Sequence, residues 1–464
     1  MSMTAAWQPA LDASLVREVL DEALAKGASF AELFLEDTVS RRLALVDTRP
    51  KDVSFAQSFG VGLRLIRGHR STYGYTSDVS PASLLELARS LAASDPAEGC
   101  TTAAPLCAES AGGVTEDEWD AACRIDLLRR ADRAARATDS RISQVEASVE
   151  ETTQRILVAN SEGLWATEVR PYARLFVQAI AAEGSVQQVA SRSPGRAEGF
   201  SFLHGLEVEA LAEEAAAAAV VMLTADHCPA GRMPVIIDKG FGGVIFHEAC
   251  GHLLETTSVA PGASIFAGRL GQSIAHPAVT AIDDGTLEGE WGSIGVDDEG
   301  MPSQRTVLIR EGVLEAYLAD RIGAERVGVP RTGSARRQSY RFAPASRMRN
   351  TYIAPGRASL EELISEIPYG LYARRMGGGS VVPGTGDFNF SVREAFIIRD
   401  GKVAEPVRGA TLLGNGADIL MRISKVGQDL ELAAGMCGSI SGSIPVNVGQ
   451  PPLRVDEITV GGRS

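Results

Sequence analysis

One short stretch constrains this chain more than any other: His247 and His252 lie five positions apart, and Glu248 directly follows the first of them. Two imidazoles can hold a metal ion, and a neighbouring carboxylate can take a proton from metal-bound water, so the pattern is typical of metal hydrolases. The stretch follows an apolar run at 233–238 that predicts a strand, and a glycine-bearing turn at 239–243. We therefore expect rigid elements to hold both imidazoles.

The spacing of the two histidines is unusual for a helix. Side chains at i and i+5 point about 140° apart on a regular α-helix, whereas those at i and i+4 are about 40° apart and can share one ion. We expect a single π-type turn, helped by the flexible backbone of Gly251, to bring His247 and His252 back to one face. The alternative is a chance pattern in which both rings are hydrogen-bonded in the core.

Length and composition describe an ordinary folded protein. The 464 residues suffice for two or more domains, and 45% of them are hydrophobic. Acidic residues outnumber basic ones by 59 to 45, and the net charge of −14 argues against nucleic acid or an anionic membrane as a partner. The six cysteines are irregularly spaced, and residues 1–7 lack the basic and apolar parts of a signal peptide. We therefore expect a cytoplasmic protein.

The pattern along the chain predicts an α+β protein of two domains, 1–225 and 226–464. In the first domain we expect an antiparallel sheet with helices, and a loop at 95–115 that divides it in two. The expected helices are 11–26, 80–93, 116–138 and 208–224, and the expected strands are 30–46 (as a pair), 53–66 and 142–189 (as a meander). The second domain is expected to be mostly β, with short strands joined by tight turns at 283–286, 292–300 and 305–317, and to carry the metal-binding helix.

Three other polar features have competing explanations. The acidic pairs at 283–284 and 297–298 fit turn chemistry better than a calcium loop, because the spaced oxygen ligands are missing. Six arginines between 331 and 349 either bind carboxylates of a peptide or partner, or are solvated or paired within the chain. The adjacent His227 and Cys228 lack a second ligand pair and are expected to be incidental.

The stretch 386–398 alternates as a strand and follows a glycine-rich segment at 376–380. Glycines beside a strand permit close backbone approach. We therefore expect an extended peptide to add as a strand near 388–398, because main-chain pairing accepts many sequences.

A catalytic zinc commonly takes three protein ligands and a water, so one ligand must come from outside the pair of histidines. The local sequence leaves four candidates: Cys250, Glu255, His276 and Cys437. Cys250 would point away if the histidines converge, and Glu255 also suits a role as hydrogen-bond partner of a ligand. Cys437 lies between glycines that would let a thiolate turn toward a distant site.

Several stretches of the C-terminal half carry a family resemblance when they are taken together. They are 246–255 (FHEACGHLLE), 283–286 (DDGT), 292–300 (GSIGVDDEG), 347–353 (RMRNTYI) and the tail 435–460 with VNVGQP at 446–451. The combination resembles the TldD side of the TldD/PmbA (TldE) metallopeptidases, whereas the N-terminal half matches only in the order of its elements. Cys250 and Leu253 depart from the family pattern and leave Cys250 as a competing thiolate.

The resemblance implies a zinc peptidase in which His247, His252 and Cys437 hold one Zn²⁺ per chain. Glu248 is then the general base on the metal-bound water. A TldE/PmbA-like subunit, or a second copy of this chain, is expected as partner, enclosing the site so that only extended or unfolded peptides enter. The alternative is a non-catalytic peptide-binding or assembly subunit with a structural metal, which would not need Glu248 beside an open coordination position.

Overall fold

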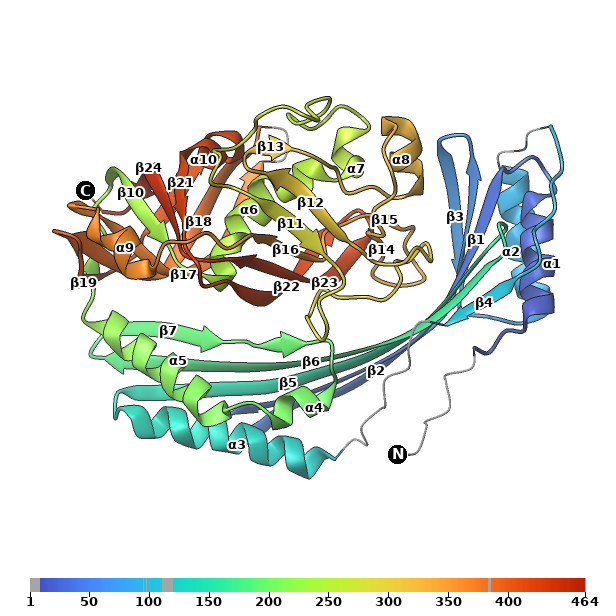
Figure 1. Ribbon diagram of the computed structural model, residues 1–464. Helices are drawn as coiled ribbons and strands as arrows, with labels where there is room; N and C mark the ends of the chain where they lie inside the picture. The colour runs from blue at the N-terminus through green and yellow to red at the C-terminus, as the bar shows by residue number, and fades with distance from the viewer. Residues whose placement is uncertain (1–8, 95, 97, 111–119, 383–384, 464) are drawn as a thin grey trace.

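The computed structural model describes residues 9–94, 96, 98–110, 120–382 and 385–463. The first half of the chain forms one long, curved sheet, and the second half forms a strand-rich body on the concave face of that sheet (Figure 1). The fold is α+β, as the sequence predicts. None of the helices in the described part of the chain is long and apolar enough to cross a membrane.

Four long strands make up most of the first sheet: β1 (Phe30–Val46), β2 (Arg49–Arg67), β5 (Ile142–Asn160) and β6 (Leu164–Glu183). Neighbours pair antiparallel in the order β2-β1-β5-β6. Residues 30–46 form a single strand rather than the predicted pair. The chain turns only at Asp47 and Thr48, whose φ angles of 51° and 66° give a two-residue hairpin.

Shorter strands complete this sheet: β3 (Arg70–Thr76), β4 (Cys107–Ser110), β7 (Val186–Arg192) and β8 (Gly195–Arg196). The strand β4 pairs in parallel with β6. It lies in the segment 95–115, where we expected a loop, so that expectation is wrong for these four residues. A partner that is distant in sequence sets their conformation, which local composition does not reveal. Residues 111–115 lie outside the described residues.

Five helices accompany the first sheet: α1 (Ala13–Leu24), α2 (Pro81–Ser94), α3 (Ala121–Thr138), α4 (Phe200–His204) and α5 (Val208–Leu223). The pair α1 and α2 lies at one end of the sheet and the pair α3 and α5 at the other, and each pair closes its own hydrophobic core (Figure 1). Four of these helices match the predicted ones to within a few residues. The expected start of the third, 116–119, lies outside the described residues.

In the second half, one sheet closes on itself, because β18 pairs with both ends of the order β17-β10-β24-β20. Its strands, with three others attached to the closed part, are β9 (Asp226–His227), β10 (Gly231–Ile237), β17 (Tyr369–Val382), β18 (Asp387–Arg399), β19 (Lys402–Arg408), β20 (Thr411–Asn415), β21 (Ile423–Val426) and β24 (Leu453–Gly461). Within the described chain β18 has β17 on one side and β19 and β20 on the other. The expected addition of a peptide at 388–398 is therefore wrong, because alternation predicts a strand without revealing its neighbours.

A third sheet has the order β13-β12-β11-β16-β23-β22, so β22 is an edge strand. Its strands are β11 (Ala281–Asp284), β12 (Arg305–Arg310), β13 (Val313–Leu314), β16 (Asn350–Ile353), β22 (Glu431–Ser439) and β23 (Gly442–Gln450). The remaining elements are η1 (Gly240–Gly243), α6 (Val244–Ala249), η2 (Gly251–Leu254), α7 (Thr256–Val259), α8 (Arg321–Val327), α9 (Leu360–Ser365), α10 (Gly416–Arg422) and the two-stranded sheet of β14 (Ala335–Arg336) and β15 (Ala345–Ser346). The stretch 292–300, expected to be strand, is irregular.

Buried ion pairs join the second half of the chain to the first sheet. Arg337 pairs with Glu32 on β1, and Glu299 pairs with Arg64 on β2, each at 2.5 Å. Burial opposes the ionisation of Glu299, but the nearby guanidinium groups outweigh it, so the pKa of this carboxyl lies below its ordinary value. Several arginines between 331 and 349 form ion pairs in the described structure, and their partners are carboxylates of this same chain. This favours pairing within the chain over capture of a peptide.

The acidic pairs are only partly explained by turn chemistry. Asp297 accepts the N–H groups of Glu299 and Met301 as a turn residue does, at 3.0 and 2.9 Å. Its neighbour Asp298 instead pairs with Arg170 of β6 at 2.8 Å. Asp283 and Arg349 form a similar buried pair at 2.7 Å, and Asp284 lies 3.8 Å from Arg305, so three of these four carboxylates are ion-pair partners.

Candidate metal centre

The two histidines lie on either side of a break in the helix. The helix α6 ends at Ala249, Cys250 takes φ −131° and ψ −49°, and the chain continues as the 3₁₀ turn η2. The N–H of Cys250 still bonds to the carbonyl of Phe246 at 3.0 Å, and the N–H of Leu253 bonds to the carbonyl of Cys250 at 3.0 Å. The expected π-type turn is therefore wrong: a change from α to 3₁₀ bonding absorbs the extra residue.

Gly251 has a steric role rather than the flexibility we expected of it. A Cβ atom at this position would overlap the sulfur of Met348. The φ angle of Gly251 is not positive, so residues other than glycine could adopt its backbone conformation. The close packing of Met348 is what excludes a side chain and keeps the break compact.

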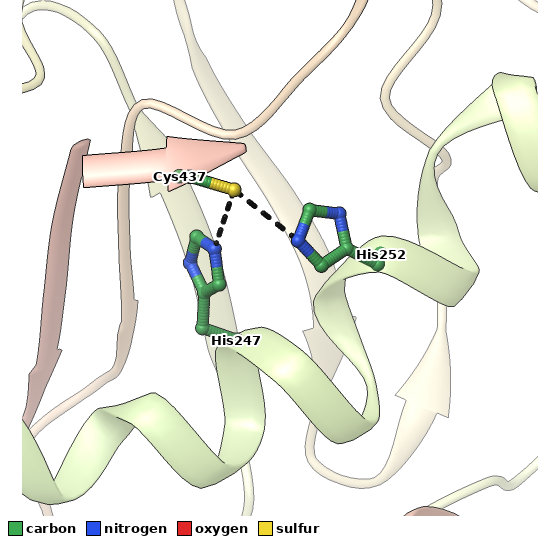
Figure 2. A group of neighbouring side chains, drawn as sticks. All are labelled: His247, His252 and Cys437. Carbon is green, nitrogen blue, oxygen red and sulfur yellow. Dashed lines mark hydrogen bonds between the residues drawn. The ribbon is translucent and has the colours of Figure 1, made fainter. Parts of the chain in front are cut away.

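The break brings both imidazoles to one thiol. Nε2 of His247 and Nε2 of His252 each lie 3.2 Å from Sγ of Cys437, which reaches them from the edge strand β22 (Figure 2). The two rings stand nearly perpendicular, with centroids 5.1 Å apart. All three donor atoms lie within 4.8 Å of one another, and this is the cluster of metal-ligating type found among the described residues.

The other candidate ligands lie elsewhere. Cys250 is buried and its thiol donates to the carbonyl of Gly416 at 3.5 Å, and burial raises the pKa of this thiol far above its ordinary value. Nδ1 of His276 accepts the N–H of Ala278 at 3.2 Å, in a local turn. Cys228 is also buried, with its Sγ 3.5 Å from the carbonyl oxygen of Pro229.

Glu255 contacts the cluster without joining it. The carboxylate is 2% exposed, and Oε2 lies 3.1 Å from Nδ1 of His252. Its other oxygen accepts the N–H of Met348 at 3.2 Å. A carboxylate on the far nitrogen of a ligating histidine fixes the tautomer that leaves Nε2 free to bind a metal. Nδ1 of His247 has no such partner among the described residues.

The surroundings shift the two histidines in opposite directions. Burial, with smaller contributions from His252 and Arg347, holds the pKa of His247 well below its ordinary value. Burial also lowers the pKa of His252, but the charge of Glu255 and the hydrogen bonds to Cys437 and Glu255 outweigh it and leave that pKa well above its ordinary value. The surroundings thus favour the neutral form of His247, which can ligate a metal, and the protonated form of His252, which competes with a metal for Nε2.

Glu248 is the carboxylate on the open side of the cluster. Its Oε2 lies 3.9 Å from Nε2 of His252, and the side chain is 34% exposed. His247 and Cys437 are almost fully buried, at 2% and 4% exposed, and His252 is 21% exposed. An exposed carboxylate beside the cluster suits a general base, which must contact water.

The donor set fits a tetrahedral zinc ion. Zn–N bonds of about 2.0 Å and a Zn–S bond of about 2.3 Å at tetrahedral angles place the nitrogen and sulfur atoms about 3.5 Å apart. The two distances of 3.2 Å between nitrogen and sulfur require an outward movement of a few tenths of an ångström, and the two nitrogen atoms, which lie within 4.8 Å of each other, must come to about 3.3 Å. Histidine nitrogen and cysteine thiolate are both zinc ligands, and three protein ligands with an open fourth position are typical of catalytic zinc sites.

Comparison with known families covers nearly the whole chain. The models for PmbA/TldA metallopeptidase domain 1, central domain and C-terminal domain match residues 31–94, 115–223 and 230–462. This chain belongs to the PmbA/TldD metallopeptidase family. A metalloprotease TldD homolog of Haemophilus influenzae is 35% identical over 451 residues, which cover 94% of each chain.

Two further relatives of the PmbA/TldD family add detail. A zinc metalloprotease TldD homolog of Saccharolobus solfataricus is 32% identical over 234 residues, covering 50% of this chain and 52% of its own. The crystal structure of TldE from Thermococcus kodakarensis superimposes with a TM-score of 0.75 at 19% identity, covering 97% of this chain and 100% of that chain. The fold is thus shared with TldE, and the sequence is shared with proteins named TldD.

Sequence reasoning missed the residues of this PmbA/TldD member that surround the ligands. Met348 packs on Gly251 and donates to Glu255, and Arg347 donates to the carbonyl of Cys437. Both lie in the stretch 347–353 that carried part of the family resemblance, which was the available signal. Their contacts depend on chain segments about 90 residues away in either direction, so no local pattern predicts them.

Proposed function

We propose that this chain is a zinc peptidase in which His247, His252 and Cys437 hold one zinc ion and Glu248 is the general base. The observation that carries the proposal is the convergence of three donor atoms from segments 185 residues apart beside a carboxylate that faces solvent. The names of the sequence relatives, metalloprotease and zinc metalloprotease, support the same activity.

Each side chain has a distinct task in this proposal. Zinc, when bound, supplies a Lewis acid that polarises the scissile carbonyl and acidifies water. Glu248 accepts the proton of the attacking water and returns it to the leaving amine. Glu255 keeps His252 in the tautomer that presents Nε2 to the metal.

The edge strand β22 is where we expect an extended peptide to bind. Asn447 donates its N–H to Arg349, and Ser443 donates to Gln338, so both direct their backbone groups away from β22. Ala434 and Gly438 of β22 lie opposite these two residues, and Met436 lies between them. The backbone N–H and C=O groups of these three residues therefore point toward the outer edge of the sheet.

This edge is open near the candidate ligand. Arg174 donates to the carbonyl of Ala434 at 3.2 Å, which closes one end of the edge. Met436 and Gly438, on either side of Cys437, have exposed positions and no backbone partner on that edge among the described residues. Main-chain pairing there would bring a peptide bond to the zinc without reading its sequence, which suits extended or unfolded peptides as substrates.

The family suggests the wider assembly. We propose that a TldE/PmbA-like subunit, or a second copy of this chain, encloses the site, and the shared fold with TldE supports this. We also propose a boundary between an N-terminal domain, 1–225, and a C-terminal domain, 226–464. It is supported by the gap between the central and C-terminal family matches, at 223 and 230.

The test of the proposed activity is the substitution Glu248→Gln. We expect the variant to keep its zinc, because Glu248 is not a ligand, and to cleave an unfolded peptide about 10²- to 10⁴-fold more slowly. Zinc content and cleavage rate are measured on the protein with its partner, and the exposed Glu213→Gln on α5 is the matched control. A zinc-loaded Glu248→Gln that cleaves at the full rate contradicts the proposed general base.

A further inference from the structure

Arg347 is an arginine buried without a carboxylate. Its side chain is fully buried, and none of the ion pairs among the described residues includes it. The guanidinium instead donates to the carbonyl of Cys437 at 2.5 Å, to Oγ of Ser441 at 2.9 Å and to the carbonyl of Gly442 at 2.8 Å. A charge taken out of water without an ion-pair partner is costly, so it is retained where its hydrogen bonds serve a specific arrangement.

All three acceptors belong to the hairpin that carries the thiol. They lie at the end of β22, in the turn that follows, and at the start of β23. On its outer side this end of β22 has no partner strand among the described residues, and Ile440 at the tip is 80% exposed. The planar fork of an arginine can hold several acceptors in one fixed direction, which the single point charge of a lysine cannot. Gln338 bonds to the turn on another side, to Ser441 and Ser443.

The neighbours of Arg347 contact the elements that carry the two histidines. Met348 donates its N–H to Glu255, the carboxylate that orients His252, and its sulfur packs on Gly251 in the helix break. Oγ of Ser346 accepts the N–H of Thr257 at 3.1 Å, just after that carboxylate. Three consecutive residues thus connect the helix break, the partner of one histidine and the hairpin of the thiol.

We propose that Arg347 is a positioning residue that sets the place of Cys437 relative to His247 and His252 before a metal binds. The proposal rests on the proposed zinc site and names the part of the chain that preorganises it. The thiol comes from an edge strand, so its place depends on how the hairpin end is held. Backbone pairing with β23 holds one side of this end of β22, and the guanidinium of Arg347 holds the carbonyl of Cys437 itself.

The experiment uses Co²⁺ as a spectroscopic probe in the metal-free full chain. Wild-type protein, Arg347→Met and Arg347→Lys are titrated with Co²⁺ against a chelator, and the thiolate-to-cobalt charge-transfer band is recorded. We expect Arg347→Met to bind Co²⁺ about tenfold or more weakly and to show a weakened or shifted band, because the thiolate is displaced. Arg347→Lys keeps the charge but not the fork, so we expect an intermediate loss.

The matched control is Arg124 on α3, which is 1% exposed and pairs with Glu151 far from the site. Arg124→Lys and Arg124→Met are expected to lower stability without changing Co²⁺ affinity or the band. Wild-type affinity and an unchanged band in Arg347→Met overturn the proposal. If this variant does not fold, wild-type values in Arg347→Lys overturn it. Absence of a thiolate band in wild-type protein, or its persistence in Cys437→Ala, refutes the proposed zinc site itself and is therefore a distinct failure.

Discussion

Glu255 holds two parts of the metal centre at once, since one of its oxygens faces His252 and the other accepts the backbone of Met348. His247 lacks a comparable partner at Nδ1 among the described residues, and its neutral form is favoured mainly by burial, with smaller effects of His252 and Arg347. At the scale of single residues the two histidines are thus held by different means. Only His252, of the two, has a carboxylate partner among the described residues, so we expect the centre to be more sensitive at that ligand.

Glu255→Gln tests this dependence. The amide keeps the shape of the side chain and an acceptor for Met348, but it removes the charge that favours the Nδ1-protonated ring of His252. We expect zinc affinity to fall about 10- to 100-fold, while the fold survives. Affinity is measured by competition with a chelator, and the exposed Glu325→Gln on α8 is the control. Equal affinities in the two variants would show that the carboxylate is only a structural partner of Met348.

At the scale of elements, the close packing of η1 against β23 determines where the helix α6 begins. A Cβ on Gly243 would lie 2.6 Å from the backbone nitrogen and oxygen of Gly449 on β23. His247 follows Gly243 by one helical turn, and β22 with Cys437 lies beside β23. Contact between two glycines therefore sets the distance from the helix to the strand of the thiol.

Gly243→Ala should separate these elements. Backbone atoms cannot rotate away as a side chain can, so we expect a loss of about 1–3 kcal/mol or more in the free energy of unfolding, together with weaker zinc binding. The control is Gly378→Ala on β17, where a Cβ meets nothing within 4 Å and φ is not positive. Urea unfolding of the metal-free proteins gives the comparison. A Gly243→Ala protein as stable as its control contradicts the close approach.

The sequence predicts elements better than it predicts their neighbours. The helices of the first half follow from periodicity, and the pair of histidines with Glu248 is singled out by a local motif together with the strand and turn before it. Cys437 came from the family resemblance, since its local sequence is also that of a buried free thiol. The partners of β18, the pairing of Arg337 with Glu32 and the break at Cys250 depend on residues far away in the chain. Such contacts leave no local pattern.

Over the whole molecule, the two halves meet through charges that are buried together. Asp320, which caps α8, lies near Glu299 and Arg64 in this region. Burial and the charge of Glu299 raise its pKa to about 6, against the weaker opposing effect of Arg64 and of hydrogen bonds from Gly323 and Thr256. The folded state therefore binds a proton at Asp320 more tightly than the unfolded chain, in which a pKa of about 3.9 is usual.

This difference makes stability depend on pH in a known direction. Between about pH 4 and pH 6 the folded state holds more protons at Asp320 than the unfolded state, so the free energy of unfolding falls as pH rises through this window, by on the order of 2–3 kcal/mol. Asp320→Asn still caps α8 but cannot ionise. We measure the free energy of unfolding by urea from pH 4 to pH 7.5. As pH rises, we expect the value for the variant to increase relative to that of the wild type. Parallel curves for the two proteins would contradict the raised pKa.

X-ray absorption at the zinc edge tests the central claim, that two histidines and Cys437 hold the metal. For the zinc-loaded wild type we predict one sulfur neighbour at about 2.3 Å and nitrogen or oxygen neighbours at about 2.0 Å. The sulfur should be absent, or the zinc lost, in Cys437→Ala, and unchanged in Cys250→Ala, whose thiol faces Gly416. A spectrum without sulfur in the wild type, or a sulfur signal that disappears with Cys250 and persists without Cys437, would contradict the account.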